Sequence, residues 1–268
     1  MRRGIPWHIF VGIFGFLLLY VPLVLVVLFS FNDSRSTGAW AGFTLHWYGE
    51  MWHDDGLRSG LLFSLFFALI SATLSLVLGT MLAFAMRRFG GFRFRRLLAG
   101  LASLPLVMPE IVTGLMMLLF FVSLRKLLPF WPANGGVSVV IAHTTFGLAF
   151  ASIVVQARLA DLDDSVLEAA SDLGAQPTDV FFSIIVPLIA PALVAAWLLA
   201  FTLSFEDAVI TQFVNGPGTT TLPVEVFSRV RLGVKPEVNA LATIMILVVA
   251  FAVTFGMVLQ SQGRKILK

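Results

Sequence analysis

Long apolar runs without charged residues constrain this chain more than any other feature of its sequence. A helix that crosses a bilayer needs about 20 predominantly apolar residues. Hydrophobic residues make up 58% of the chain and charged residues only 12%, whereas about 25% of the residues of a soluble domain are charged. The sequence therefore predicts an all-α integral membrane protein.

Six apolar runs are long enough to span a bilayer, and we expect each to form a transmembrane helix. The first follows Arg2 and Arg3, but it is longer than the apolar core of a signal peptide and lacks a small-residue cleavage site, so we expect a retained helix. No repeat or low-complexity linker divides the sequence, which predicts one membrane domain over residues 1–268. The expected spans are Ile9–Phe31, Ser59–Met86, Leu97–Leu124, Val137–Ala157, Ile184–Asp207 and Val238–Gln262.

The basic residues predict the orientation of these helices, since cytoplasmic loops are enriched in Lys and Arg. Counted on alternate sides of the predicted spans, eleven lie on the side of both termini and seven on the other. We therefore expect both termini in the cytoplasm. The eleven are Arg2, Arg3, Arg87, Arg88, Arg93, Arg95, Arg96, Arg158, Arg264, Lys265 and Lys268, and the seven are Arg35, Arg58, Arg125, Lys126, Arg229, Arg231 and Lys235.

The cytoplasmic connection of residues 158–183 is acidic, against the trend for such loops. Ser165 and Glu168 have the spacing of a capping box at a helix start. Gly174 stands where a helix end adopts positive φ, and Pro177 suits the first turn of the next helix. The loop is thus predicted to be a helical hairpin, which on periodicity alone simply connects two spans. Its acidic residues are Asp161, Asp163, Asp164, Glu168, Asp172 and Asp179.

This hairpin also carries a family resemblance. Glu168-Ala169-Ala170, Gly174 and Ile185-Val186-Pro187 together resemble the EAA signature of the membrane subunits of bacterial ABC importers. The resemblance implies the type I importer permease fold, with six transmembrane helices and a short cytoplasmic coupling helix that docks on an ATPase subunit. It also implies the residues that couple the permease to the ATPase, which are Glu168, Ala169, Ala170, Gly174 and Pro187.

Further segments are similar to the permease subunits of putrescine and spermidine importers, and most of all to the putrescine type. The match covers most of the chain, although Arg58-Ser59-Gly60-Leu61 stands where many relatives have an Asn-Ser pair. An ATP-driven importer that moves polyamines from periplasm to cytoplasm by alternating access is therefore implied. The matching segments are Ser30–Arg35, Trp47-Tyr48, Met108–Leu115, Leu199–Asp207 and Asn239–Thr243.

The same resemblance implies the location and the partners of the chain. It places the protein in the bacterial inner membrane, in contact with lipid. The implied partners are a second homologous permease subunit, two ATPase subunits that bind the ATP and Mg²⁺, and a periplasmic polyamine-binding protein.

Motifs for catalysis are missing from the sequence. It contains no G-x-x-x-x-G-K-[ST], no H-E-x-x-H and no paired-His metal spacing. We therefore expect a non-catalytic subunit with no cofactor or metal of its own, and ATP hydrolysis on a separate subunit. Membrane topology accounts for the arginines of residues 87–96, so no nucleic acid partner is expected.

Three acidic residues lie in or beside the predicted spans, namely Glu110, Glu206 and Asp207. A charge within the hydrocarbon costs ~2.5–3.5 kcal/mol, so such residues usually face a cavity or a partner. Glu110 lies thirteen residues into its span, or ~20 Å along a straight helix axis, and Pro105 and Pro109 are expected to break the helix there. A broken helix with a carboxylate at the break is typical of transporter sites.

An aromatic stripe leads to Glu206, because Trp197, Phe201 and Phe205 recur at i, i+4 and i+8. Contact between an ammonium and an aromatic face is worth ~0.5–2 kcal/mol, so the acids and the stripe together predict a pathway for a polyamine.

Each of these residues has a plainer interpretation as well. The stripe is also consistent with bundle packing, and Glu110 with a hydrogen bond to Thr113 or to a partner subunit. Glu206 and Asp207 would then be solvated at the interface or paired with Arg229 or Arg231, and His143 is expected to make an inter-helix hydrogen bond.

Rival functions are an ion-coupled secondary transporter of organic cations that titrates Glu110, a membrane scaffold, and an importer of anions. Acids along the pathway would repel an anion.

Overall fold

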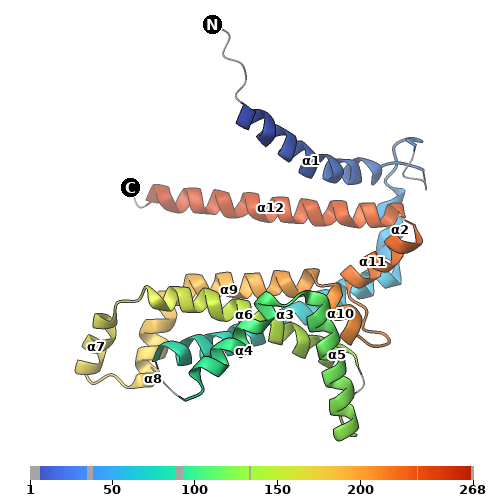
Figure 1. Cartoon of the computed structure of the whole chain (residues 1–268). Helices are drawn as coiled ribbons and strands as arrows, with labels where there is room; N and C mark the ends of the chain where they lie inside the picture. The colour runs from blue at the N-terminus through green and yellow to red at the C-terminus, as the bar shows by residue number, and fades with distance from the viewer. Residues whose placement is uncertain (1–6, 35–38, 89–92, 133, 234, 267–268) are drawn as a thin grey trace. The chain divides into compact units, whose positions relative to one another are not determined.

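The computed structural model describes residues 7–34, 39–88, 93–132, 134–233 and 235–266, and the regular secondary structure of these residues is helical apart from one isolated bridge between Asn32 and Phe43. This confirms the predicted all-α class. The chain divides into two compact units (Figure 1): unit 1 is Met1–Arg58 with Val226–Lys268, and unit 2 is Ser59–Glu225. Four of the basic residues used to predict orientation, Arg2, Arg3, Arg35 and Lys268, lie outside the described residues.

Unit 1 contains α1 (Trp7–Phe29), α2 (His46–His53) and α12 (Pro236–Ile266), and α12 packs against both of the others. The loop after α1 is organised by Asn32, whose side chain donates to the carbonyl of Ala39 and accepts from the amide of Ala41. The indole of Trp47 on α2 donates to the carbonyl of Asn32 at 2.7 Å. Side-chain hydrogen bonds therefore help to hold the described residues of this loop.

Unit 2 is a helical bundle around α6. Helix α6 packs against α9 and α4, and 56% of the residues in its most apolar 18-residue stretch are buried within the chain. The hydroxyl of Ser75 on α3 donates to the carbonyl of Thr144 at 3.1 Å, as small polar residues do between membrane helices. The helices are α3 (Asp55–Arg88), α4 (Arg95–Val107), α5 (Glu110–Leu127), α6 (Gly136–Ala160), α7 (Asp164–Asp172), α8 (Pro177–Asp179), the π-helix η1 (Val180–Ile185), α9 (Val186–Glu206), α10 (Val209–Val214) and α11 (Leu222–Leu232), of which α3 and α11 cross the boundary between the units.

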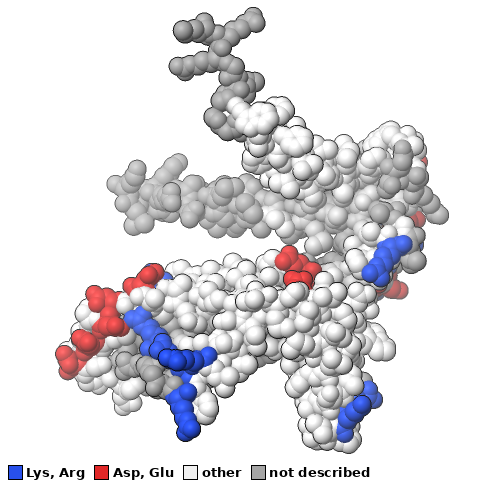
Figure 2. Space-filling model, viewed as in Figure 1, with Lys and Arg blue, Asp and Glu red and all other residues white. Residues whose placement is uncertain are grey.

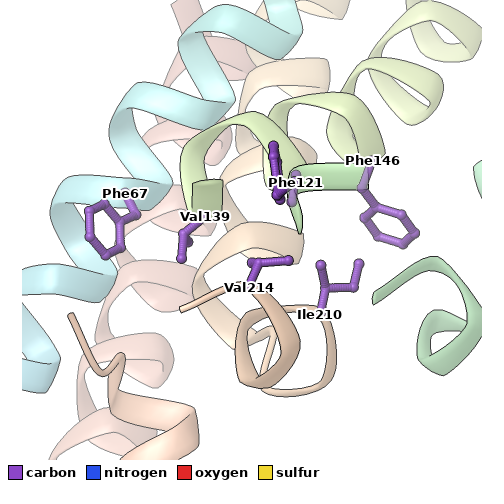
Figure 3. Packing of buried hydrophobic residues seen from close by; sticks show 7 residues of the cluster. Phe67, Phe121, Val139, Phe146, Ile210 and Val214 are labelled. Carbon is purple, nitrogen blue, oxygen red and sulfur yellow. The ribbon is translucent and has the colours of Figure 1, made fainter. Parts of the chain in front are cut away.

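Two apolar clusters form the core of unit 2. The first joins α3, α5, α6 and α10, with the side chains shown in Figure 3. The second joins α3, α6, η1 and α9 near the predicted cytoplasmic end. The first consists of Phe67, Phe121, Val139, Ala142, Phe146, Ile210 and Val214, and the second of Ala83, Ala151, Val155, Leu159, Ile185, Ile189 and Ala196.

The described helices include four that are long and apolar enough to cross a membrane, and up to five if α4 and α5 form one span. The third predicted span, Leu97–Leu124, is not one straight helix, because α4 and α5 are bent by 119°. The apolar part of α12 within the described residues, Pro236–Phe251, is shorter than a full span. Six transmembrane helices therefore remain a prediction.

Candidate functional site

The break between α4 and α5 places Glu110 at the start of a helix. Met108 is extended (ψ 138°), as a residue before proline prefers, and Pro109 caps α5 without an amide hydrogen to offer α4. The predicted break is thus confirmed. The estimate of depth along one straight axis is wrong, because the axis turns just before Glu110. The side chain of Glu110 is exposed.

Helix α5 crosses α10 immediately beyond this break. A Cβ on Gly114 would lie 2.6 Å from the ring of Phe213 and 3.2 Å from the Cα of Ile210, so only glycine permits this approach. The hydroxyl of Thr113 donates to the carbonyl of Pro109 at 3.4 Å rather than bonding Glu110. The alternative hydrogen bond between Glu110 and Thr113 is therefore absent from these described residues.

A second break separates α9 from α10, and the carboxylate of Asp207 organises it. It accepts from the amide of Thr211 at 2.7 Å, the hydroxyl of Thr211 at 2.8 Å and the amide of Ile210 at 3.1 Å. These bonds satisfy amides that the start of α10 would otherwise leave free. With only 8% of its side chain exposed, Asp207 is a buried part of the bundle and not an open, solvated acid.

His143 connects this break to α6. Its Nδ1 lies 2.6 Å from the Ser204 hydroxyl, and its Nε2 lies 3.1 Å from Asp207 Oδ2 and 2.8 Å from Thr211 Oγ1. Since a carboxylate only accepts, a neutral ring carries its proton on Nε2 and accepts on Nδ1. The predicted inter-helix hydrogen bond of His143 is confirmed, and it joins α6, α9 and α10.

The C-terminal part of α9, which precedes this break, carries an exposed acid and half-buried aromatic side chains. Glu206 is exposed, in contrast to Asp207 beside it. The predicted stripe exists as two stacked pairs, with ring centroids 5.4 Å apart for Trp197 and Phe201 and 5.9 Å apart for Phe201 and Phe205. The indole of Trp197 also donates to the Thr73 hydroxyl at 3.2 Å, so its end of the stripe is fixed to α3.

The two exposed carboxylates, those of Glu110 and Glu206, each come shortly before the point where α5 crosses α10. Glu110 precedes Gly114 by four residues, and Glu206 precedes Ile210 by four, while Gly114 and Ile210 meet where α5 crosses α10. Figure 2 shows red acidic side chains over the adjoining ends of α5 and α9, surrounded by uncharged surface. This part of unit 2 therefore offers negative charge next to stacked aromatic rings.

The acidic hairpin has the predicted turn but a different cap. The N-cap of α7 is Asp163, which accepts from the amide of Ser165 at 3.0 Å, so the prediction of a capping box at Ser165 is wrong. Hydrogen bonds from the amide and from the hydroxyl of Ser165 lower the pKa of Asp163. Aspartate and serine are about equally good N-cap residues, so the sequence does not decide which of the two caps α7. In the structure the helix begins one residue after Asp163, and Asp163 is the cap.

The turn at Gly174 is confirmed. Gly174 has φ 79°, and the amides of Gly174 and Ala175 donate to the carbonyls of Ser171 and Ala170. This is the Schellman arrangement, in which a left-handed residue closes the helix end. Pro177 then opens α8, as predicted.

A π-helix, which the sequence did not predict, joins this hairpin to α9. In η1 the amide of Val186 donates to the carbonyl of Phe181, five residues back. Pro187 follows directly and has no amide hydrogen, so the helix cannot continue its ordinary bonding there. The proline was the one available signal for this irregularity.

In unit 1, Arg229 forms two hydrogen bonds to Asp54, at 2.7 and 2.8 Å. These bonds are the main cause that lowers the pKa of Asp54 to about 2. Arg231 lies 4.4 Å over the ring of Phe227. Arg229 therefore has an acidic partner within unit 1, and the alternative pairing of Arg229 or Arg231 with Glu206 or Asp207 stays a prediction.

Metal-binding clusters of three or more His, Cys, Asp or Glu do not occur among the described residues.

The sequence matches a known family over residues 75–265, the "Binding-protein-dependent transport system inner membrane component" family. The chain belongs to this family. It is a membrane permease subunit of the ABC importer class, and the alternative of an ion-coupled secondary transporter is not favoured.

Named relatives of this inner membrane component cover most of its length. It is 47% identical to the putrescine transport system permease protein PotI of Escherichia coli (strain K12), over 90% of this chain and 86% of that one. It is 38% identical to the spermidine/putrescine transport system permease protein PotC of the same strain, over 85% and 84%. These matches confirm the resemblance inferred from the sequence.

The fold of this inner membrane component is also known from solved structures. A bacterial ABC transporter involved in the import of the acidic polysaccharide alginate has a subunit that superposes with a TM-score of 0.67 at 17% identity, over 94% of both chains. The type I importer permease fold is therefore confirmed, whereas an identity this low says nothing about cargo.

Proposed function

We propose that this chain is the membrane-spanning permease subunit of an ATP-driven importer that moves polyamines, putrescine or spermidine, from periplasm to cytoplasm by alternating access. The observation that carries the proposal is the pair of exposed carboxylates, Glu110 and Glu206, at the crossing of α5 and α10. A polyamine carries separated ammonium groups, which fit separated carboxylates. The names of the putrescine and spermidine permeases that resemble this chain agree with this chemistry.

The proposed cargo pathway consists of the residues predicted from the sequence. Glu110 and Glu206 attract the ammonium groups, and Trp197, Phe201 and Phe205 offer stacked faces to the carbon chain and to its charges. Asp207 belongs to the pathway through the break that it holds, because its own carboxylate is buried.

The hairpin is the proposed contact with the ATPase. Helix α7 turns Ala170 toward its own chain, while Glu168 and Ala169 are exposed and 88% of Leu173 is exposed. Exposed apolar surface on a short acidic helix suits docking against another subunit. Gly174 shapes the end of this helix, and Pro187 begins the span that would follow its motion.

The proposed assembly contains a second homologous permease, two ATPase subunits with their ATP and Mg²⁺, and a periplasmic polyamine-binding protein. The chain forms one transmembrane domain in the inner membrane with both termini in the cytoplasm. The basic residues at the cytoplasmic turns and the family support this arrangement.

Uptake by the reconstituted complex tests the proposal. Proteoliposomes that contain the full complex, with ATP on the side of the ATPase, should accumulate labelled putrescine when the binding protein is added outside. An acidic sugar should not compete with this uptake, whereas spermidine should. Accumulation that a proton gradient drives without ATP would contradict the proposal.

A substitution at Gly174 tests the coupling part separately. Gly174→Asp should abolish cargo uptake while the complex still assembles, because it places a negative charge near Asp172 at the C-terminal end of α7. Gly174→Asn is the matched control, since asparagine tolerates this conformation and adds no charge. Equal uptake by the wild type and the Asp variant would contradict docking at this hairpin.

A further inference from the structure

The acidic hairpin is anchored to a membrane helix by one arginine. Nη2 of Arg87, in the last turn of α3, donates to the carbonyl of Leu162 at 3.0 Å and to the carboxylate of Asp164 at 2.6 Å. These two acceptors lie on either side of Asp163, the N-cap of α7. Arg87 therefore binds both sides of the turn from which α7 begins.

The other arm of the hairpin touches the same stretch of α3. The ring of Phe181, in η1, packs edge-on against Phe84 with centroids 5.1 Å apart. Phe84 and Arg87 are three residues apart, so they share one face of α3. Helix α3 thus contacts the hairpin where it enters α7 and again where it leaves for α9.

Figure 2 shows the charges involved, with basic side chains over the end of α3 and acidic side chains over α7 at the same end of unit 2. Among the ion pairs of the described residues, Arg87–Asp164 is the one that joins the hairpin to a membrane helix. Asp164 is 74% exposed, and a pair this open adds little to folding stability. The pair instead fixes the position of α7 relative to α3, because Nη2 of Arg87 donates to two acceptors of the same turn.

We propose that Arg87 is a positioning residue that transmits the motion of the coupling helix to α3, so that α3 and α9 move together when the ATPase closes. This rests on the proposed function, and it adds a non-covalent route from the ATPase into the membrane besides the covalent paths through α6 and through η1. Topology alone would give Arg87 no role beyond that of Arg88 beside it.

The test compares Arg87→Gln with Arg96→Gln, a described and exposed arginine of the same predicted cytoplasmic turn, in the full reconstituted complex. The quantity measured is the number of ATP molecules hydrolysed per putrescine transported. We expect this ratio to rise roughly fivefold or more for Arg87→Gln, the usual range of coupling effects, and to stay at the wild-type value for Arg96→Gln. Equal ratios for all three proteins would overturn the proposal.

A charge exchange separates positioning from a loss of folding. Arg87→Asp should uncouple as Arg87→Gln does, and the double variant Arg87→Asp with Asp164→Arg should recover much of the coupling, because the pair is restored in reverse. A double variant that assembles but stays uncoupled would overturn the proposal. If the wild type itself shows no ATP-dependent uptake, the proposed function fails first and the role of Arg87 fails with it.

A covalent link gives an independent test. The chain has no cysteine, so Phe84→Cys with Phe181→Cys introduces the only two. Joining them with a short bifunctional thiol reagent should leave uptake near that of the unlinked variant if the hairpin and α3 move as one body. Loss of uptake on linking, reversed by cleaving the linker, would show that they slide past each other and would overturn the proposal.

Discussion

Unit 2 breaks two of its helices beside an acidic residue, and the two breaks are built in opposite ways. Between α4 and α5, Pro109 ends the bonding of the backbone and Glu110 is left exposed. Between α9 and α10, the carboxylate of Asp207 is buried and takes up the free amides itself. Among the side-chain hydrogen bonds of the described residues, none involves the carboxylate of Glu110. Burial and partners, more than position in a span, therefore separate an acid that holds the structure from one available to cargo.

The largest effect should come from removing the buried acid. Asp207→Ala leaves the amides of Ile210 and Thr211 and the hydroxyl of Thr211 without their acceptor, at a cost of about 1–3 kcal/mol for each buried group left unpaired. Thermal unfolding of the purified complex should show a clear loss of stability. Asp207→Asn keeps one acceptor oxygen and should lose less, and wild-type stability in the Ala variant would show that the second break does not depend on this residue.

A smaller loss is expected on the other side of the same network. His143→Ala removes the link from α6 to Ser204 and Asp207, and each hydrogen bond is worth about 1 kcal/mol net. His143→Gln restores a donor and an acceptor on one side chain and should recover part of the stability. Equal unfolding temperatures for the two variants would mean that packing, and not these bonds, makes His143 matter.

A substitution at the break between α4 and α5 should change transport more than it changes stability. Pro109→Ala returns an amide hydrogen and permits α4 and α5 to straighten, which would move Glu110. We expect uptake to fall several-fold while the unfolding temperature stays the same or rises. Unchanged uptake would indicate that Glu110 does not need the bend to act.

The smallest effect should come from Glu206. Its side chain is exposed, so Glu206→Gln should change stability by no more than about 0.5 kcal/mol. It should raise the KM for putrescine modestly, because Glu110 still supplies charge at the crossing. A loss of stability as large as that of Asp207→Ala would place Glu206 with the structural acids instead.

Local chemistry was predictable from the sequence where one residue decides it. Pro109 and Gly174 dictate a break and a turn by their own covalent structure, and both features are present. The cap of α7 was less predictable, because Asp163 and Ser165 compete for similar short-range bonds.

The burial of Asp207 was not predictable, since its partner His143 is 64 residues away in the sequence. Glu206 and Asp207 are neighbours of the same charge, and only the packing of α6 against α9 distinguishes them. The turn of 119° between α4 and α5 has the same origin, because prolines permit a bend while the crossing at Gly114 fixes where α5 goes.

The KM for putrescine uptake by the reconstituted complex with Glu110→Gln tests the central claim most directly. This variant removes one charge at nearly constant shape from an exposed carboxylate. A hydrogen bond to a charged group is worth about 1.5–3 kcal/mol, and 1.4 kcal/mol is a factor of ten in affinity. We expect KM to rise roughly tenfold or more, with assembly and unfolding temperature unchanged. An unchanged KM in a fully assembled complex would contradict the assignment of Glu110 to the cargo pathway.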